Sequence, residues 1–121
     1  MALVQVAQRA TDLTRAAQFY SLLLGREPSG LFDPPGLLFF NLDGVRLLLD
    51  ENAPSALLYL NVDDIDAEVQ RLRAAGVEVV SEPHVIFSHD DDTLGPAGAQ
   101  EWQAFITDSE GNTVGLVEWR H

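Results

Sequence analysis

The chain has 121 residues, of which 46% are hydrophobic and 21% charged, and its formal net charge is −12 at pH 7. This length suits one small domain, and no apolar run approaches the roughly eighteen residues that a membrane-spanning helix needs. The acidic excess would repel phosphate backbones and anionic lipids, so we expect neither nucleic acid nor a membrane as a partner. The sequence contains no cysteine, which excludes disulfides and thiolate chemistry. Its first residues lack the basic and apolar segments of a signal peptide, and we expect a cytoplasmic protein.

The first pattern in the chain is an apolar, strand-like run ahead of Asp12, followed by a helical pattern that ends at Gly25. Aspartate can accept hydrogen bonds from the free N–H groups at a helix start, and glycine tolerates the left-handed turn just beyond a helix end. The same order returns with Asp64 and Gly76, at nearly the same spacing. The sequence therefore predicts an internal repeat of a strand followed by a helix.

Short β-patterned runs follow each predicted helix. The first copy has two such runs around the turn Asp43-Gly44, and the second copy has three, the last two joined around Glu110-Gly111. Residues 88–100 form an extra segment in the second copy, and their glycine, proline and acidic content predicts an exposed loop. Gly115 is unexpected, because it falls in the middle of the last predicted strand, where glycine is unfavourable.

Two such copies, with "DLTRAAQFYSLLLG" after the first strand and "DSEGNTVGLVE" at the last, resemble the vicinal oxygen chelate superfamily of glyoxalases, bleomycin-resistance proteins and extradiol dioxygenases. The resemblance covers nearly the whole chain. It implies an α+β, glyoxalase-like fold with two βαβββ modules, about 1–53 and 54–121, in a single domain of residues 1–121. Their curved mixed sheets would form a cup with the helices outside. The matching signature residues are Asp12, Phe19, Tyr20, Leu24 and Gly25 in the first motif, and Asp108, Gly111 and Asn112 in the second, where Ser109 replaces the usual proline.

In metal-dependent members of that superfamily, four His, Glu or Gln ligands project into the cup from the first and last strands of each module. The corresponding positions here are Gln5, Leu47 or Leu48, Leu57 and Gly115. Only the glutamine could ligate, and one neutral amide cannot hold a divalent cation. We therefore expect no metal and no other cofactor. The glycine would enlarge the cup or let another backbone approach closely.

Other candidates for chemistry are weak. His84, His89 and the acidic run Asp90–Asp92 match no ligand motif, and an exposed acidic loop is the favoured interpretation. Gln8 has the alternation of a helix-facing position, and the sequence offers no reason for a polar residue there. No catalytic residue can be assigned. The candidate ligand-binding residues, chosen from strand alternation and from the histidine and aromatic residues of strand-like runs, are Gln5, Arg9, Leu57, Tyr59, His84, Phe87, Trp102 and Gly115.

Three functions remain open at this level. The first is a metal-free protein that binds a small, aromatic or cationic molecule in the cup, as antibiotic-sequestering relatives do. The second is a metal-dependent lyase, isomerase or dioxygenase with an unusual site such as Gln5, His84 and Glu118. The third is a cup used only for association. Because small two-module relatives commonly form dimers, we also expect a homodimer.

Overall fold

The computed structural model describes residues 2–121, and residue 1 of the predicted first module lies outside the described residues. The chain divides into two compact units. The first unit contains the residues up to Ala56 together with the turn 109–112, and the second contains Leu57–Asp108 and Thr113–His121. Among residues 2–121, neither helix has the length and apolar character needed to cross a membrane.

The first unit is a four-stranded sheet covered by one helix. Its sheet has the order β1-β4-β3-β2, in which β1 runs parallel to β4 and the other pairs are antiparallel. The short strand β2 was not predicted, because three residues carry too little pattern. The elements are β1 (Gln5–Arg9), α1 (Leu13–Leu24), β2 (Gly30–Phe32), β3 (Leu37–Leu42) and β4 (Val45–Asp50).

Helix α1 begins and ends at the residues that the sequence indicates. The Asp12 carboxylate accepts a hydrogen bond from the Arg15 N–H at 3.0 Å, and Gly25 takes the left-handed conformation with φ of 67°. Its apolar face buries Ala16, Tyr20 and Leu23. Tyr20 packs against Phe40 of β3, with ring centroids 6.3 Å apart.

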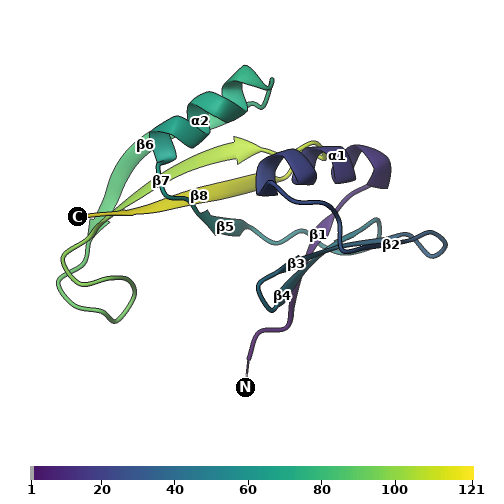
Figure 1. Cartoon of the computed structure of the whole chain (residues 1–121), viewed down its shortest axis with the longest axis horizontal. Coiled ribbons are helices and arrows are strands. Elements are labelled where there is room, and N and C mark those ends of the chain that lie inside the picture. Colours follow the sequence, from purple (N-terminus) through teal and green to yellow (C-terminus); the bar gives the residue numbers. More distant parts are fainter. Residues whose placement is uncertain (1) are drawn as a thin grey trace. The chain divides into compact units, whose positions relative to one another are not determined.

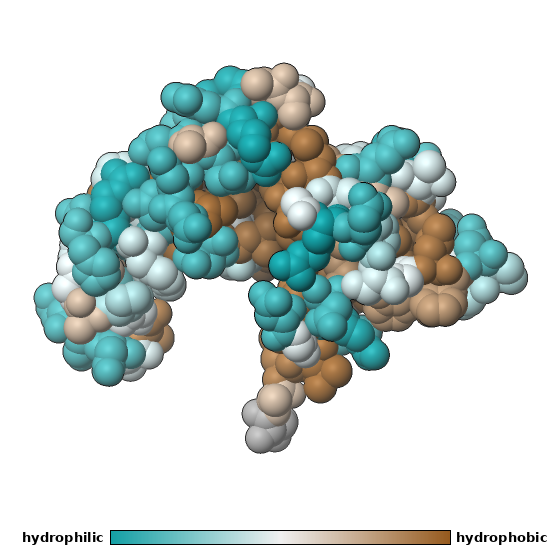
Figure 2. Space-filling view, viewed as in Figure 1, coloured by the Kyte–Doolittle hydropathy of each residue, from teal (hydrophilic) through white to brown (hydrophobic). Residues whose placement is uncertain are grey.

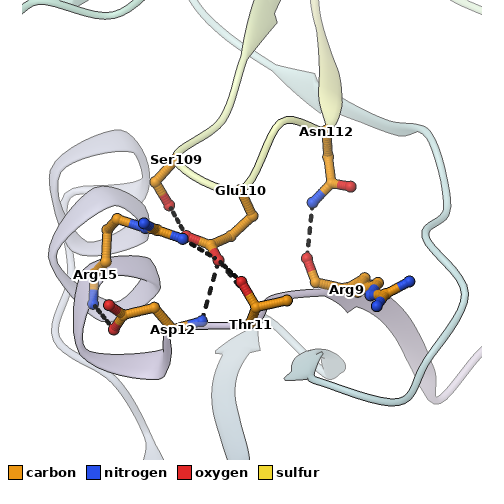
Figure 3. Close-up of polar contacts among 7 residues, drawn as sticks. All are labelled: Arg9, Thr11, Asp12, Arg15, Ser109, Glu110 and Asn112. Carbon is orange, nitrogen blue, oxygen red and sulfur yellow. Dashed lines mark hydrogen bonds and ion pairs between the residues drawn. The ribbon is translucent and has the colours of Figure 1, made fainter.

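The turn 109–112 carries Glu110, whose carboxylate holds the start of α1 (Figure 3). It accepts hydrogen bonds from the N–H groups of Thr11 at 2.9 Å and Asp12 at 3.2 Å, and it pairs with the Arg15 guanidinium at 2.7 Å. These contacts, the Arg15 hydrogen bond first among them, lower the pKa of Glu110 to about 2. A buried carboxylate thus compensates the free N–H groups at the helix start.

The second unit repeats the same plan with longer strands. Its sheet order is β5-β8-β7-β6, with β5 parallel to β8. Helix α2 lies along one face of this sheet, and its visible outer surface is mainly hydrophilic (Figures 1 and 2). The elements are β5 (Leu58–Asn61), α2 (Ile65–Ala74), β6 (Val79–Ser88), β7 (Gln100–Thr107) and β8 (Thr113–Arg120). Each unit is therefore a βαβββ module, which confirms the predicted α+β fold class.

Candidate functional site

The face of the second sheet that lies opposite α2 carries the candidate site. Side chains alternate along β8, so Val114 and Leu116 are buried on the α2 side while Gly115, Val117 and Trp119 point the other way. Cross-strand pairing arranges the second set and its neighbours in three rows. The rows are Tyr59–Gly115–Phe105, Asn61–Val117–Gln103 and Trp119–Glu101.

A pocket of about 380 Å³ lies over these rows. That volume is in the usual range of about 300 to 1,000 Å³ for small-molecule sites. Leu94, from the loop between β6 and β7, adds an apolar side chain that is 77% exposed. The residues that line the pocket are Tyr59, Asn61, Leu94, Glu101, Gln103, Val117 and Trp119.

The structure explains Gly115. A Cβ at this position would lie 2.7 Å from Tyr59 Cδ1, closer than carbon atoms approach, and would make a tight contact of 3.1 Å with Phe105 Cε1. The Tyr59 ring lies over the glycine and meets the Phe105 ring edge to face at 5.9 Å. The expectation of an enlarged cup or a close backbone was therefore wrong, because an aromatic side chain occupies the space.

The polar part of the pocket is a network centred on Glu101. Its Oε2 atom accepts a hydrogen bond from Gln103 Nε2 at 2.7 Å, and its Oε1 atom lies 2.9 Å from His89 Nε2. The three side chains are largely buried. An ionised carboxylate only accepts hydrogen bonds, so the histidine carries its hydrogen on Nε2 in this contact.

His89 was predicted to belong to an exposed acidic loop, and this interpretation was wrong for the histidine. Its ring is 3% exposed and packs edge to face against Phe87 at 4.8 Å and Trp119 at 5.4 Å. Gly95 lies so close that an added Cβ would meet the histidine ring at 2.9 Å. The acidic residues that follow, Asp90–Asp92, are exposed as predicted.

Sequence reasoning missed Glu101 and Gln103 as pocket residues, and it missed His89 as the buried partner of Glu101. Alternation from Phe105 would have placed Gln103 and Glu101 on one face of β7, since side chains two apart share a face. Nothing in the sequence indicates the histidine, because its partners come from other strands.

Of the predicted site residues, Tyr59 lines the pocket, and Gly115 lies beside its ring on the neighbouring strand. Leu57 is exposed just before β5. His84 is exposed on β6, where its Nδ1 lies 2.8 Å from the Glu82 carbonyl oxygen.

The other predicted site residues lie elsewhere. Phe87 supports the His89 ring and is not itself part of the pocket lining. Trp102 faces the α2 side of the sheet, where the Arg120 guanidinium stacks on its ring at 4.0 Å. Gln5 and Arg9 belong to β1 of the first unit.

The four positions that hold a metal in metal-dependent relatives do not fit one here. Pairing with Ala7 shows that Leu48, not Leu47, shares the face of Gln5 on the first sheet. Neither Leu48 nor Leu57 nor Gly115 offers a donor atom. Within residues 2–121, no group of three or more His, Asp or Glu side chains is arranged to hold a metal ion.

The alternative metal site that includes Glu118 does not assemble within the second unit. The Glu118 carboxylate accepts a hydrogen bond from the Ile65 N–H at the start of α2, at 2.8 Å, and pairs with Arg120 at 2.6 Å. These contacts, that with Arg120 first, hold its pKa below the usual range. His84 pairs with Gln103 and so shares its face of the sheet. Glu118 pairs with Trp102 and lies on the other face, so His84 and Glu118 do not meet.

Comparison with solved structures identifies many chains of the same fold. A lactoylglutathione lyase from Agrobacterium tumefaciens is 25% identical, with a TM-score of 0.71 over 97% of this chain and 92% of that one. TnmS3, described as an antibiotic binding protein from Streptomyces sp. CB03234, is 24% identical, with a TM-score of 0.70 over 98% and 96%. A protein from the mobile metagenome of V. Pseudocholerae is 15% identical, with a TM-score of 0.77 over 100% and 96%.

A comparison with curated proteins gives no match. The model of one protein family matches residues 2–116, which is nearly the whole chain. The chain therefore belongs to the Glyoxalase/Bleomycin resistance protein/Dioxygenase superfamily.

Proposed function

We propose that this protein binds a small organic molecule in the pocket of its second unit, without the metal centre of its metal-dependent relatives. The observation that carries the proposal is the combination of aromatic, apolar and acceptor side chains around a pocket of about 380 Å³. Pockets for organic ligands are typically apolar with a few well-placed polar groups. Here the polar groups are Glu101, Gln103 and Asn61, and the aromatic ones Tyr59 and Trp119.

The similar solved structures include both a binding protein and an enzyme. TnmS3 is described as an antibiotic binding protein. The similar lactoylglutathione lyase favours catalysis as the second candidate function. Gln5, Leu48, Leu57 and Gly115 would offer a metal only one donor side chain, which speaks against catalysis through the superfamily's metal site.

The test is a fragment screen by ¹H–¹⁵N NMR on protein that has been treated with a chelator and dialysed. We expect fragments to shift the amide signals of β5, β7 and β8 in the second unit. Asn61→Trp, at an exposed pocket position, fills the pocket and should abolish these shifts. Leu31→Trp, at an exposed position on β2, is the matched control and should retain them.

Binding that requires added Ni²⁺, Zn²⁺, Fe²⁺ or Mn²⁺ would contradict the proposal and favour the enzyme. Fragment shifts that persist in Asn61→Trp would also contradict it, because the ligand would then lie outside this pocket.

We further propose that the protein acts as a homodimer in the cytoplasm. The outer edge of β6 pairs with no other described strand and exposes Val85, Ile86 and Phe87. Apolar side chains on an open edge favour association. Light scattering on a size-exclusion column should give twice the mass of the 13.3 kDa chain, and a monomer at high concentration would refute the dimer.

A further inference from the structure

From the chemistry of the pocket we infer its ligand class: an organic cation, with a protonated nitrogen held by Glu101 and a planar apolar body between the aromatic side chains. This inference rests on the proposed function and names the kind of molecule that the same pocket takes.

The first argument is the direction of the two amide side chains. The Glu101 carboxylate only accepts hydrogen bonds, so the atom of Gln103 that faces it must be the amide nitrogen Nε2. The amide oxygen of Gln103, Oε1, is therefore the atom directed away from Glu101. Asn61 Nδ2 donates to the Val117 carbonyl oxygen at 3.1 Å, which fixes Oδ1 as its other end. Within the described residues, neither oxygen receives a hydrogen bond. The pocket thus offers acceptors to a ligand that carries donors.

The second argument is charge. Among residues 2–121, no Lys or Arg side chain lines the pocket, and Glu101 is the one charged residue in its lining. Arg120 lies on the α2 side of the sheet, where it pairs with Glu118 and Asp66. His89 Nε2 contacts one carboxylate oxygen of Glu101, Oε1, and Gln103 contacts the other. Only 16% of the Glu101 side chain is exposed, so a cation placed there is poorly screened by water.

The third argument is the pair of aromatic side chains. Tyr59 and Trp119 stand in the outer two rows of the site, on either side of the row that contains Val117. The four residue-to-residue steps from Gly115, beside Tyr59, to Trp119 span about 13 Å along the strand. The Tyr59 ring lies against the glycine, and the side chain is still 52% exposed, so one face of it is open to a ligand. Aromatic faces attract planar rings and cations alike.

The test uses three matched planar probes at pH 7.5: 9-aminoacridine, which is a cation, acridine, which is neutral, and acridine-9-carboxylate, which is an anion. Isothermal titration should give 9-aminoacridine an affinity at least about tenfold higher than acridine, as a charge-assisted hydrogen bond predicts. Glu101→Gln should reduce that ratio to about three or less. Glu78→Gln removes one exposed charge outside the pocket and should keep the wild-type ratio. Asn61→Leu removes the free acceptor Oδ1 and leaves Glu101 in place. It should also lower the affinity for 9-aminoacridine.

The outcomes separate the two proposals. Equal affinity for the cation and the neutral probe, with both lost in Asn61→Trp, would refute the cationic ligand class while supporting a small-molecule pocket. An equal loss in Glu101→Gln and Glu78→Gln would refute it as well, because attraction to the whole acidic surface would then explain binding. If none of the three probes binds, the ligand class is refuted, and the fragment screen alone decides the proposed function. Thermal unfolding of each variant distinguishes loss of binding from loss of folding.

Discussion

Replacement of Glu110 by glutamine should destabilise the protein at neutral pH and have little effect in strong acid. The side chain is 2% exposed and accepts hydrogen bonds from the N–H groups of Thr11 and Asp12, in addition to its ion pair with Arg15. Both N–H groups donate to the same atom, Oε1, so the glutamine oxygen can still accept from them while the charge is removed. It therefore isolates the electrostatic part of the contact at the start of α1 (Figure 3).

The magnitude follows from the pKa of Glu110, which the fold lowers from 4.5 to about 2. Each pKa unit corresponds to about 1.4 kcal/mol, so the ionised carboxylate contributes at most about 3 kcal/mol to the free energy of unfolding. Arg15 is 52% exposed, and solvent screening reduces the contribution of its ion pair. We expect Glu110→Gln to lower the free energy of unfolding by about 1 to 3 kcal/mol at pH 7.

The pH dependence has a definite sign. The folded pKa lies below the unfolded one, so the stabilisation is fully present above pH 4.5 and is lost as the pH falls toward 2. Urea unfolding followed by circular dichroism, at pH 7 and at pH 2.5, should show the wild-type and Glu110→Gln curves converging in acid. Asp43→Asn is the control: its carboxylate is 93% exposed and 4.0 Å from Arg26, so its removal should change little. Equal stability of wild type and Glu110→Gln at pH 7, or a difference that grows in acid, would refute the reasoning.

Three further predictions concern the packing. Gln8 is fully buried, and neither the nitrogen nor the oxygen of its amide has a hydrogen-bond partner among residues 2–121. Gln8→Met should therefore raise the free energy of urea unfolding by about 1 to 3 kcal/mol. A lower free energy of unfolding would contradict this and indicate a bound water at the amide. Gly115→Ala should lower the free energy of unfolding by about 1 to 3 kcal/mol and displace the Tyr59 ring. In a Tyr59→Ala background the same substitution should cost less, because the clash is gone. Equal costs in the two backgrounds would exclude the clash. Arg120→Ala should lower the melting temperature, because the guanidinium stacked on Trp102 is lost. The Trp102 fluorescence should then change more on mild heating than in the wild type. An unchanged melting curve would contradict this.

The repeat was predictable because its signals are local. An aspartate that accepts an N–H three residues later and a glycine with positive φ specify a helix end within a few residues, as at Asp12, Gly25, Asp64 and Gly76. The turn at Asp43-Gly44 is local in the same sense. These features, with the apolar periodicity between them, were enough for the repeat and the α+β class. A third strand after the first helix, β2, was implied only by the family resemblance.

The sequence by itself thus determined the two modules, and it also indicated that the superfamily's metal ligands are missing, since three of the four positions carry no donor. Tertiary structure alone decided which side chains form the pocket. Glu101 and Trp119 are brought together by the register of β7 on β8, and His89 joins them only through the fold of its loop. Alternation gives a residue's face relative to its own strand, but which face is open and which strand lies beside it depend on contacts distant in sequence. For that reason Trp102, a reasonable pocket candidate from its residue type, lies beneath Arg120 on the opposite side of the sheet.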